Sequence, residues 1–160
     1  MIRIDIPGFG PREITTVVTD YTGTHAFAGK LRSEVRTRLI ELAQQAEIHV
    51  LTSDTFGTAE RELHDLPVTL HLLTGVKHDE QKRAFVLAKD AAHVAALGNG
   101  NNDRLMLEAV RDAGGLAIAV DNGEGCAVGA LLAAHISVHG SENALDLLLD
   151  QDRFRATLRF

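Results

Sequence analysis

Residues 14–20, Ile14-Thr-Thr-Val-Val-Thr-Asp20, carry the strongest indication of the fold and are followed directly by Tyr21-Thr-Gly-Thr24. Its first six residues are β-branched and show little polar alternation, which is the pattern of a strand covered on both faces. Such strands are typical of parallel sheets with helices on both sides. A carboxylate at the end of a strand lies at the edge where doubly wound folds bind ligands. The stretch therefore predicts a fold class and the place of a site.

The rest of the chain alternates short strand patterns with helical ones. Val35, Leu39 and Leu42 are one example of apolar residues at helical spacing. A β-α-β-α order implies a mostly parallel, doubly wound sheet between two layers of helices, and so a three-layer α/β/α domain. We expect residues 1–160 to form one such domain. The further predicted strands are 48–51, 68–73, 94–97, 116–120 and 136–138.

Two finer expectations concern the ends of the chain. Residues 2–6 read as a strand that adds an edge to the sheet or pairs between subunits. Ser141 is expected to be the N-cap of the last strongly apolar helix pattern, with Glu142 favourable in its first turn.

Composition and charge exclude several classes of function. The chain is 45% apolar and 24% charged, as soluble domains usually are. It has 16 Lys and Arg against 22 Asp and Glu, a net charge of -6, which argues against a nucleic-acid partner. Six Phe, one Tyr and no Trp argue against binding by base stacking. The lone Cys126 excludes an internal disulfide and a multi-cysteine metal site.

The sequence shows neither a secretory signal nor a membrane segment. The first ten residues already mix charges with Pro and Gly, and the longest apolar stretch, 126–134, is too short to cross a bilayer. We therefore expect a cytoplasmic protein that does not bind a membrane.

Polar clusters follow three of the predicted strands, at 20–24, 52–54 and 98–103. An aspartate such as Asp20 suits phosphoryl transfer, because it can form an acyl phosphate that water later cleaves. The small residues after it let backbone amides close around a tetrahedral anion. Taken alone, a strand-end aspartate begins a turn about as often as it performs chemistry.

The other clusters offer what a phosphoryl site needs. The oxygen-rich stretch 98–103 can bind a hard cation such as Mg²⁺, although Gly and Asn are also common in plain turns. Thr52 can donate its hydroxyl to a phosphate oxygen. Lys82, near the start of a helix predicted over 79–89, can offset negative charge, although a single lysine is usually solvated.

Together these segments resemble the four motifs of the haloacid dehalogenase (HAD) superfamily of aspartate-nucleophile phosphohydrolases. The greatest likeness is to the phosphorylation domain of P-type ATPases. Asp20-Tyr-Thr-Gly-Thr24 is similar to D-K-T-G-T with Tyr in place of Lys, Leu51-Thr-Ser-Asp54 to L-T-G-D, and Gly98-Asn-Gly-Asn-Asn-Asp103 to G-D-G-x-N-D. Lys82 falls where the motif lysine stands. The resemblance spans about residues 12–140 and extends to small soluble P-type-ATPase-like proteins of bacteria and archaea.

The resemblance implies a Mg²⁺-dependent phosphohydrolase with a role for each matching residue. Asp20 would be the nucleophile and Thr52 would bind phosphoryl oxygens. Lys82 would neutralise negative charge on Asp20 and on the phosphate. The phosphate-binding set would be Thr22, Gly23, Thr52, Ser53 and Lys82. The cofactor Mg²⁺ would be held by Asp20, the Thr22 carbonyl, Asn99 and, through water or by orienting its neighbours, Asp103.

Two departures from the family pattern bear on turnover. Thr22 stands where the superfamily phosphatases carry an aspartate that acts as general acid and base, a loss of about 10²–10⁴ in rate. Asn99 replaces a directly ligating aspartate, which removes one negative charge from the metal site. These changes imply a slow or specialised phosphatase, or a catalytically weak or inactive module that binds phosphate.

The spacing of the motifs bears on access to the site. The intervals Thr24 to Thr52 and Thr52 to Lys82 each have room for one helix-and-strand unit, so we expect no cap domain. An open site suits a small phosphorylated substrate or a phosphoprotein, and a neighbouring subunit could cover it, so we expect a homo-oligomer. A dinucleotide-binding site is disfavoured because the third fingerprint glycine is missing after Gly98 and Gly100.

The eight histidines form no recognisable metal pattern. His135 and His139 are four residues apart but belong to a strand pattern, so they would not share a helical face. His49 and His71 lie in predicted strands and are expected to be packed or at an edge. His25 directly follows the first motif, where a packed role is favoured and a substrate-facing role remains open.

Overall fold

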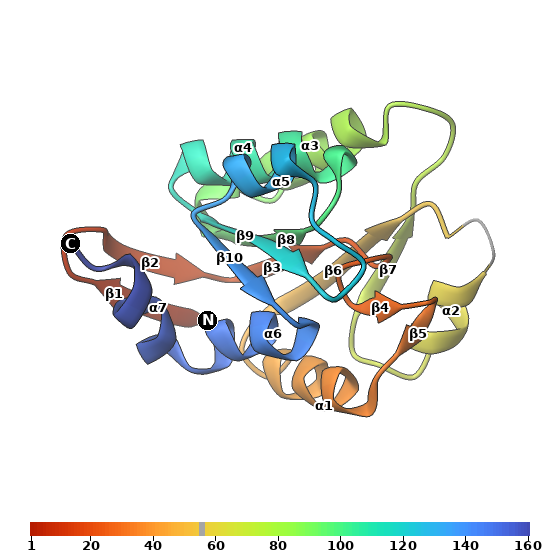
Figure 1. The fold of residues 1–160 in the computed structure, drawn as a ribbon, viewed down its shortest axis with the longest axis horizontal. Coiled ribbons are helices and arrows are strands. Elements are labelled where there is room, and N and C mark those ends of the chain that lie inside the picture. The colour runs from red at the N-terminus through yellow and green to blue at the C-terminus, as the bar shows by residue number, and fades with distance from the viewer. Residues whose placement is uncertain (55–56) are drawn as a thin grey trace.

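A central sheet of six parallel strands organises the computed structural model, which describes residues 1–54 and 57–160 (Figure 1). The spatial order β10-β9-β8-β3-β6-β7 places β3 inside the sheet, where the chain switches from building one side to building the other. This confirms the doubly wound parallel sheet. The strands are β3 (Thr16–Thr19), β6 (Glu47–Thr52), β7 (Thr69–Leu72), β8 (Val94–Gly98), β9 (Leu116–Asp121) and β10 (Ile136–His139).

Helices cover both faces of the sheet, which confirms the three-layer α/β/α arrangement (Figure 1). One layer holds α3 (His78–Ala88), α4 (Arg104–Ala113) and α5 (Val128–Ala133). The other holds α1 (Ser33–Leu42), α2 (Thr58–Leu63) and α6 (Ser141–Leu149), and α7 (Gln151–Leu158) follows α6. Within the described ranges, none of these helices is long and apolar enough to reach across a membrane.

The strands separate two apolar cores. Val17 and Leu97 face the core formed with α1 and α6, whereas Val18 and Ala96 face the core formed with α3 and α4. All four residues of β3 are buried, which explains why its sequence shows so little polar alternation.

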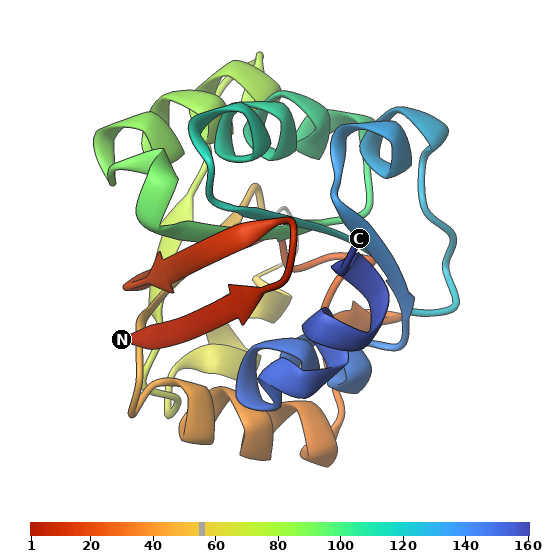
Figure 2. The ribbon, with the colours of Figure 1, turned by 90° about the vertical axis from the view of Figure 1, so that its left-hand side faces the viewer.

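The N-terminal strand departs from the expectation. β1 (Ile2–Ile6) pairs antiparallel with β2 (Gly10–Ile14), with Ile2 opposite Ile14, and the two form a sheet of their own. The chain can reverse between them because Gly8 and Gly10 adopt φ +79° and +94°. Figure 2 shows this hairpin beside α7. The expectation that residues 2–6 add an edge to the main sheet is therefore wrong, whereas their pairing between subunits stays a prediction. The central strand begins at Thr16 rather than Ile14.

The start of α6 also differs from the expectation. Gly140 is the N-cap and Ser141 is the first helical residue, so the prediction that Ser141 caps the helix is wrong. Its hydroxyl instead donates a hydrogen bond to the carbonyl of Thr24. Glu142 lies in the first turn as expected. The serine thus connects α6 to the segment that follows β3.

A short hairpin lies between that segment and α1. It consists of β4 (Ala26–Phe27) and β5 (Lys30–Leu31), which pair antiparallel. The interval from Thr24 to Thr52 therefore holds this hairpin, α1 and β6. The hairpin brings the chain back toward α1 after the polar segment at the end of β3 (Figure 1).

We expect Gly115→Ala to reduce the free energy of unfolding by about 3 kcal/mol, because overpacking against backbone cannot relax. A Cβ on Gly115 would lie 2.3 Å from the carbonyl oxygen of Ala91 and 2.5 Å from that of Val94. Gly114→Ala is the matched control: no atom lies within 4 Å of its Cβ, and only the left-handed φ of +92° opposes it, at about 1 kcal/mol. Urea denaturation measures both, and equal losses would contradict the packing argument.

Candidate functional site

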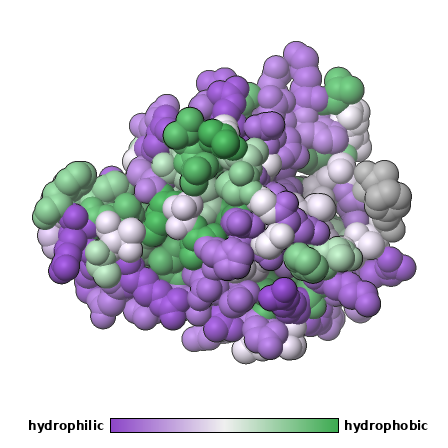
Figure 3. Space-filling view, viewed as in Figure 1, coloured by the Kyte–Doolittle hydropathy of each residue, from purple (hydrophilic) through white to green (hydrophobic). Residues whose placement is uncertain are grey.

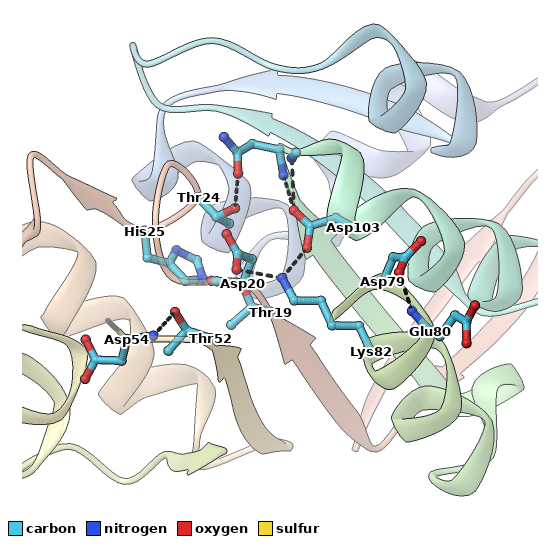
Figure 4. A network of polar contacts seen from close by, with 12 residues as sticks. Thr19, Asp20, Thr24, His25, Thr52, Asp54, Asp79, Glu80, Lys82 and Asp103 are labelled. Atoms are coloured by element: carbon cyan, nitrogen blue, oxygen red, sulfur yellow. Dashed lines mark hydrogen bonds and ion pairs between the residues drawn. The ribbon is translucent and has the colours of Figure 1, made fainter. Parts of the chain in front are cut away.

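Three buried charged side chains meet at the carboxyl end of the parallel strands (Figure 4). Asp20 directly follows β3, Lys82 lies in α3, and Asp103 ends the short 3-10 turn Asn101–Asp103 before α4. The Lys82 ammonium donates to Asp20 Oδ1 and to Asp103 Oδ1, each at 2.7 Å. The side chains of Lys82 and Asp103 are fully buried, and 8% of the Asp20 side chain is exposed. The structure therefore brings these three predicted site residues together.

The loop after β8 fixes the position of Asp103. Its second oxygen, Oδ2, accepts hydrogen bonds from the backbone N–H groups of Asn99 (3.0 Å) and Gly100 (2.9 Å). Gly98 is required for this turn, since a Cβ there would lie 2.5 Å from the Cβ of Asp103. Asp103 thus uses one oxygen to order its loop and the other to hold Lys82.

The Thr52 cluster lies at the end of β6, the strand next to β3. Thr52 is buried, and its Oγ1 accepts a hydrogen bond from the backbone N–H of Asp54 at 3.2 Å. Since the oxygen acts as an acceptor there, its hydroxyl proton remains available for a bound anion. Ser53 is exposed. The Asp54 carboxylate instead accepts from the backbone N–H groups of Ala59 and Glu60, at the start of α2.

The segment 20–26, named here the nucleophile loop after the role expected for Asp20, packs against Asn99. Thr22 is exposed. Gly23 adopts φ +77°, and a Cβ there would lie 2.3 Å from Asn99 Nδ2, so only glycine fits. Thr24 Oγ1 donates to Asn99 Oδ1 at 3.3 Å. The structure thus places Asn99 beside the loop of Asp20, with its amide oxygen already accepting one hydrogen bond.

Three side chains that the motifs do not include hold the nucleophile loop. Ser141 donates to the carbonyl of Thr24, and Asn122 Nδ2 donates to that of Ala26 at 2.8 Å. His25 is 2% exposed and its Nε2 lies 2.9 Å from Thr19 Oγ1, so the open alternative of a substrate-facing His25 is wrong. Asn122 could have been predicted as a site residue from the sequence, because it directly follows β9 at the carboxyl end of the parallel strands.

Two buried carboxylates share one ammonium, which sets the charge of the site. Burial, followed by the negative charge of Asp103, raises the pKa of Asp20 to about 7, against the opposing effects of Lys82 and the Tyr21 backbone N–H. Burial opposes the charged form of Lys82, but Asp20 and Asp103 outweigh it and hold its pKa above the ordinary value. The site therefore carries a surplus of negative charge that a further cation or a proton would neutralise.

A cation at this place would need more than side-chain carboxylates. Within residues 1–54 and 57–160, no three side chains among His, Cys, Asp and Glu gather in a way that could hold a metal ion. The oxygen donors at hand are Asp20, the Asn99 amide and the backbone carbonyls of the nucleophile loop. Magnesium suits such a set, because it is commonly held by one or two carboxylates and completes its shell with water.

A large open cavity lies at the other end of the sheet. It measures about 730 Å³ and is lined by the amino ends of β6 and β7, with Thr15, Glu47 and Val68 among its walls. No charged cluster like that of Asp20, Lys82 and Asp103 faces it. We assign the site to the buried charges, because strongly shifted pKa values of this kind gather at functional sites.

Comparison with known proteins gives one sequence relative. The Uncharacterized protein MJ0073 of Methanocaldococcus jannaschii is 41% identical over 66 residues, which cover 41% of this chain and 67% of that protein. The chain belongs to the same family as this archaeal protein. No family model matches the chain.

Solved structures resemble the chain over most of its length. The cobalt-bound deoxy-D-mannose-octulosonate 8-phosphate phosphatase (YrbI) of Haemophilus influenzae has a TM-score of 0.66 at 16% identity, covering 91% of each chain. The corresponding Moraxella catarrhalis phosphatase, in complex with magnesium, phosphate and KDO, scores 0.68 at 16% identity, covering 91% and 94%.

A Legionella pneumophila structure assigned to the HAD superfamily (subfamily III A) scores 0.67 at 14% identity, covering 89% of this chain and 86% of that one. At these identities the likeness shows the fold. The chain therefore has the HAD-superfamily fold that its motifs implied.

We expect Asp20→Asn to stabilise the metal-free protein at pH 8 by about 1–3 kcal/mol. The folded-state pKa near 7 lies above the ordinary 3.8, so the contribution of Asp20 to stability is full below about pH 4 and is lost as the pH rises through 7. The variant keeps a neutral group throughout, so its advantage over wild type should shrink at pH 4.5. Guanidinium denaturation at both pH values measures this.

The matched control is Asp103→Asn. An amide has only one acceptor oxygen, so it cannot serve both Lys82 and the two backbone N–H groups, and the variant should be less stable at both pH values. An Asp20→Asn protein that is less stable than wild type at pH 8 would contradict the charge argument.

Proposed function

We propose that this protein is a Mg²⁺-dependent phosphohydrolase that works through an aspartyl-phosphate on Asp20. The observation that carries the proposal is the buried Lys82 ammonium that bridges Asp20 and Asp103 at the carboxyl end of β3. Phosphoryl transfer needs little beyond positioning and charge compensation, and a fixed carboxylate beside a fixed ammonium offers both. The phosphatases with the same fold support the reaction class.

The proposed roles follow from the geometry. Lys82 fixes one oxygen of Asp20, and the carboxylate attacks phosphorus while the bond to the leaving oxygen breaks. Water then cleaves the acyl phosphate, releases phosphate and restores the carboxylate. The Thr52 hydroxyl, Ser53 and the backbone N–H group of Thr22 hold the phosphoryl oxygens. The N–H group of Gly23 donates to the Ala26 carbonyl at 3.2 Å and would have to leave it to contribute.

The residues present fit magnesium. Asp20, the Thr22 carbonyl and Asn99 would hold it, and Asp103 would contribute through water, since both of its oxygens already accept hydrogen bonds. When bound, the ion supplies positive charge that draws the substrate phosphate to Asp20 and offsets its negative charge. The negative surplus of Asp20 and Asp103 over Lys82 is the physical reason for such binding.

The substrate class is a small phosphorylated molecule or a phosphoprotein. The Moraxella catarrhalis neighbour was solved with phosphate and KDO, which supports the small-molecule reading. Between Thr24 and Thr52 the chain adds only a two-stranded hairpin and α1 before β6, which favours an open site without a cap domain. The proposed enzyme is cytoplasmic. The likeness of its motifs to the P-type ATPase core supports a phosphoenzyme of long lifetime.

We also propose a homo-oligomer. Figure 3 shows apolar side chains gathered over α5, and this short helix exposes 68% of Val128, 42% of Leu131 and 73% of Leu132. Its start contacts the loop of Asn99, since the Ala127 N–H donates to the Asn99 carbonyl at 2.7 Å. A second copy on this surface would lie close to the open site.

A second candidate function is a phosphate-binding or regulatory module without turnover. Thr22 is exposed and carries no carboxylate to act as general acid, and the Asn99 oxygen already accepts from Thr24. Both observations favour slow chemistry. They leave phosphate binding at Asp20, Thr52 and Lys82 intact, so binding and turnover must be measured separately.

We expect wild-type protein with Mg²⁺ to hydrolyse a generic aryl phosphate and Asp20→Asn to lose the activity by at least about 10³-fold, because the nucleophile is gone. Released phosphate is the readout, with EDTA as a second control. Beryllium fluoride, which mimics an acyl phosphate, should bind wild type only with Mg²⁺. Equal hydrolysis by both proteins would contradict the enzyme, and tight binding without hydrolysis of any phosphate would establish the module.

We expect Asn99→Asp to tighten Mg²⁺ binding by about tenfold, since it adds a negative charge at a proposed ligand. Isothermal titration calorimetry at pH 8 measures the affinity. Asn101→Asp is the matched control, because it adds the same charge at an exposed position of the same loop and should change the affinity less than about twofold. An equal gain in Mg²⁺ affinity in both variants would contradict the assignment of Asn99 as a metal ligand.

A further inference from the structure

We propose that His25 and Thr19 form a buried hydrogen-bonded pair that positions Asp20. In this pair the neutral imidazole of His25 donates from Nε2 to Thr19 Oγ1, and the Thr19 hydroxyl donates to the backbone carbonyl of Asp20. The proposal rests on the proposed function, since it deepens the account of the same site. Neither residue belongs to the motif positions that suggested that function.

The geometry of the pair is continuous from the ring to the nucleophile. Thr19 Oγ1 lies 2.9 Å from the Asp20 carbonyl oxygen, and His25 Nε2 lies 2.9 Å from Thr19 Oγ1. Thr19 is fully buried and His25 is 2% exposed. Figure 4 shows the imidazole beside Thr19 and Asp20.

The backbone of Asp20 needs such support because β3 ends one residue earlier. The Asp20 N–H donates to the Leu97 carbonyl at 3.1 Å, so β8 holds one side of the residue. Its carbonyl lies beyond the last paired residue of the strand and accepts from Thr19. His25 therefore acts on Asp20 by fixing the rotamer of Thr19.

The single proton of the Thr19 hydroxyl determines the tautomer of His25. Since that proton is donated to the Asp20 carbonyl, Oγ1 can only accept from the imidazole, and Nε2 must carry a hydrogen. His25 Nδ1 is buried without a hydrogen-bond partner among the described residues, and a proton there would bury an unpaired N–H. Burial lowers the pKa of His25 to about 4, which agrees with a neutral ring.

His25 acts by positioning and not as the acid that Thr22 fails to supply. The cavity that its ring helps to line, with Asn122 and Ser141, is about 10 Å³, on the order of a single water molecule. A phosphorylated substrate therefore cannot reach the imidazole. The hydrogen bonds from Ser141 and Asn122 to the nucleophile loop are accepted by the carbonyls of Thr24 and Ala26. The His25–Thr19 pair instead contacts Asp20 itself.

Four variants and one control test the pair. His25→Gln keeps an N–H donor near the place of Nε2, whereas His25→Leu and Thr19→Val remove the donor and the hydroxyl, and the fourth variant combines these two. His49→Leu is the control, because it also removes a buried histidine, from β6. The probe is beryllium fluoride with Mg²⁺. Tyr21 is the only tyrosine and there is no tryptophan, so intrinsic fluorescence reports from the nucleophile loop itself.

We expect His25→Leu and Thr19→Val each to weaken beryllium fluoride binding by about tenfold, which is the worth of one buried hydrogen bond. The double variant should also lose only about tenfold, because both changes break the same connection. His25→Gln should stay within about threefold of wild type. His49→Leu should reduce stability and leave the affinity unchanged.

Several results would overturn the proposal. They are losses that multiply in the double variant, a His25→Gln protein as weak as His25→Leu, and ¹⁵N spectra at pH 7 that place the proton on Nδ1. If wild type itself binds no beryllium fluoride, the proposed function fails. The His25–Thr19 hydrogen bond is then tested by the ¹⁵N spectra and by the exchange rates of the backbone amide hydrogens of residues 21–26. This exchange should be faster in His25→Leu than in His25→Gln.

Discussion

The buried ammonium of Lys82 joins two buried carboxylates that come from different parts of the chain. A lysine that is fully buried is tolerated only when its charge is compensated. Removing Lys82 would leave two buried carboxylates without a positive partner, whereas removing one carboxylate leaves the other to pair with the ammonium. Because Asp20 follows β3, Asp103 precedes α4 and Lys82 lies in α3, the two bonds fix these three elements relative to one another. Packing alone would not require that arrangement, since apolar side chains could fill the same space.

The compensation is incomplete, and this supports the proposal that the cluster is a functional site rather than a structural ion pair. One positive charge faces two negative ones, and burial followed by the negative charge of Asp103 raises the pKa of Asp20 to about 7. Such a cluster stores unfavourable electrostatic energy, which lowers stability and which the proposed cation would relieve. The nucleophile loop is accordingly held from several directions, by Ser141, Asn122 and Thr19, so that repulsion does not displace the carboxylate.

The sequence was most informative where chemistry and strand ends coincide. Asp20 and Asp103 follow buried strands of a parallel sheet, and parallel strands end at one edge, so their meeting could be predicted from order alone. The meeting of Lys82 with both needed the resemblance, because one lysine on a helix carries no local signal. The pairing of the N-terminal strand and the structural role of Ser141 were mispredicted. In both cases the local pattern was read correctly as a strand or a helix start, and its partner was missed. The strand at residues 2–6 pairs with the segment directly after it, whose last residue, Ile14, had been read as part of the central strand. Ser141 bonds to Thr24, which is distant in sequence.

Asn99 shows how the departures from the family pattern fit this electrostatic constraint. A carboxylate at this position could still accept the hydrogen bond from Thr24, so that bond does not explain the amide. The amide nitrogen does what a carboxylate cannot, because it donates to the carbonyl of Gly125 at 3.4 Å and lies against Gly23. A third carboxylate would also add to the repulsion that already raises the pKa of Asp20. At the proposed magnesium site, Asn99 would therefore exchange a share of metal affinity for a connection between the nucleophile loop and the loop before α5. It would also lower the electrostatic cost of the metal-free state.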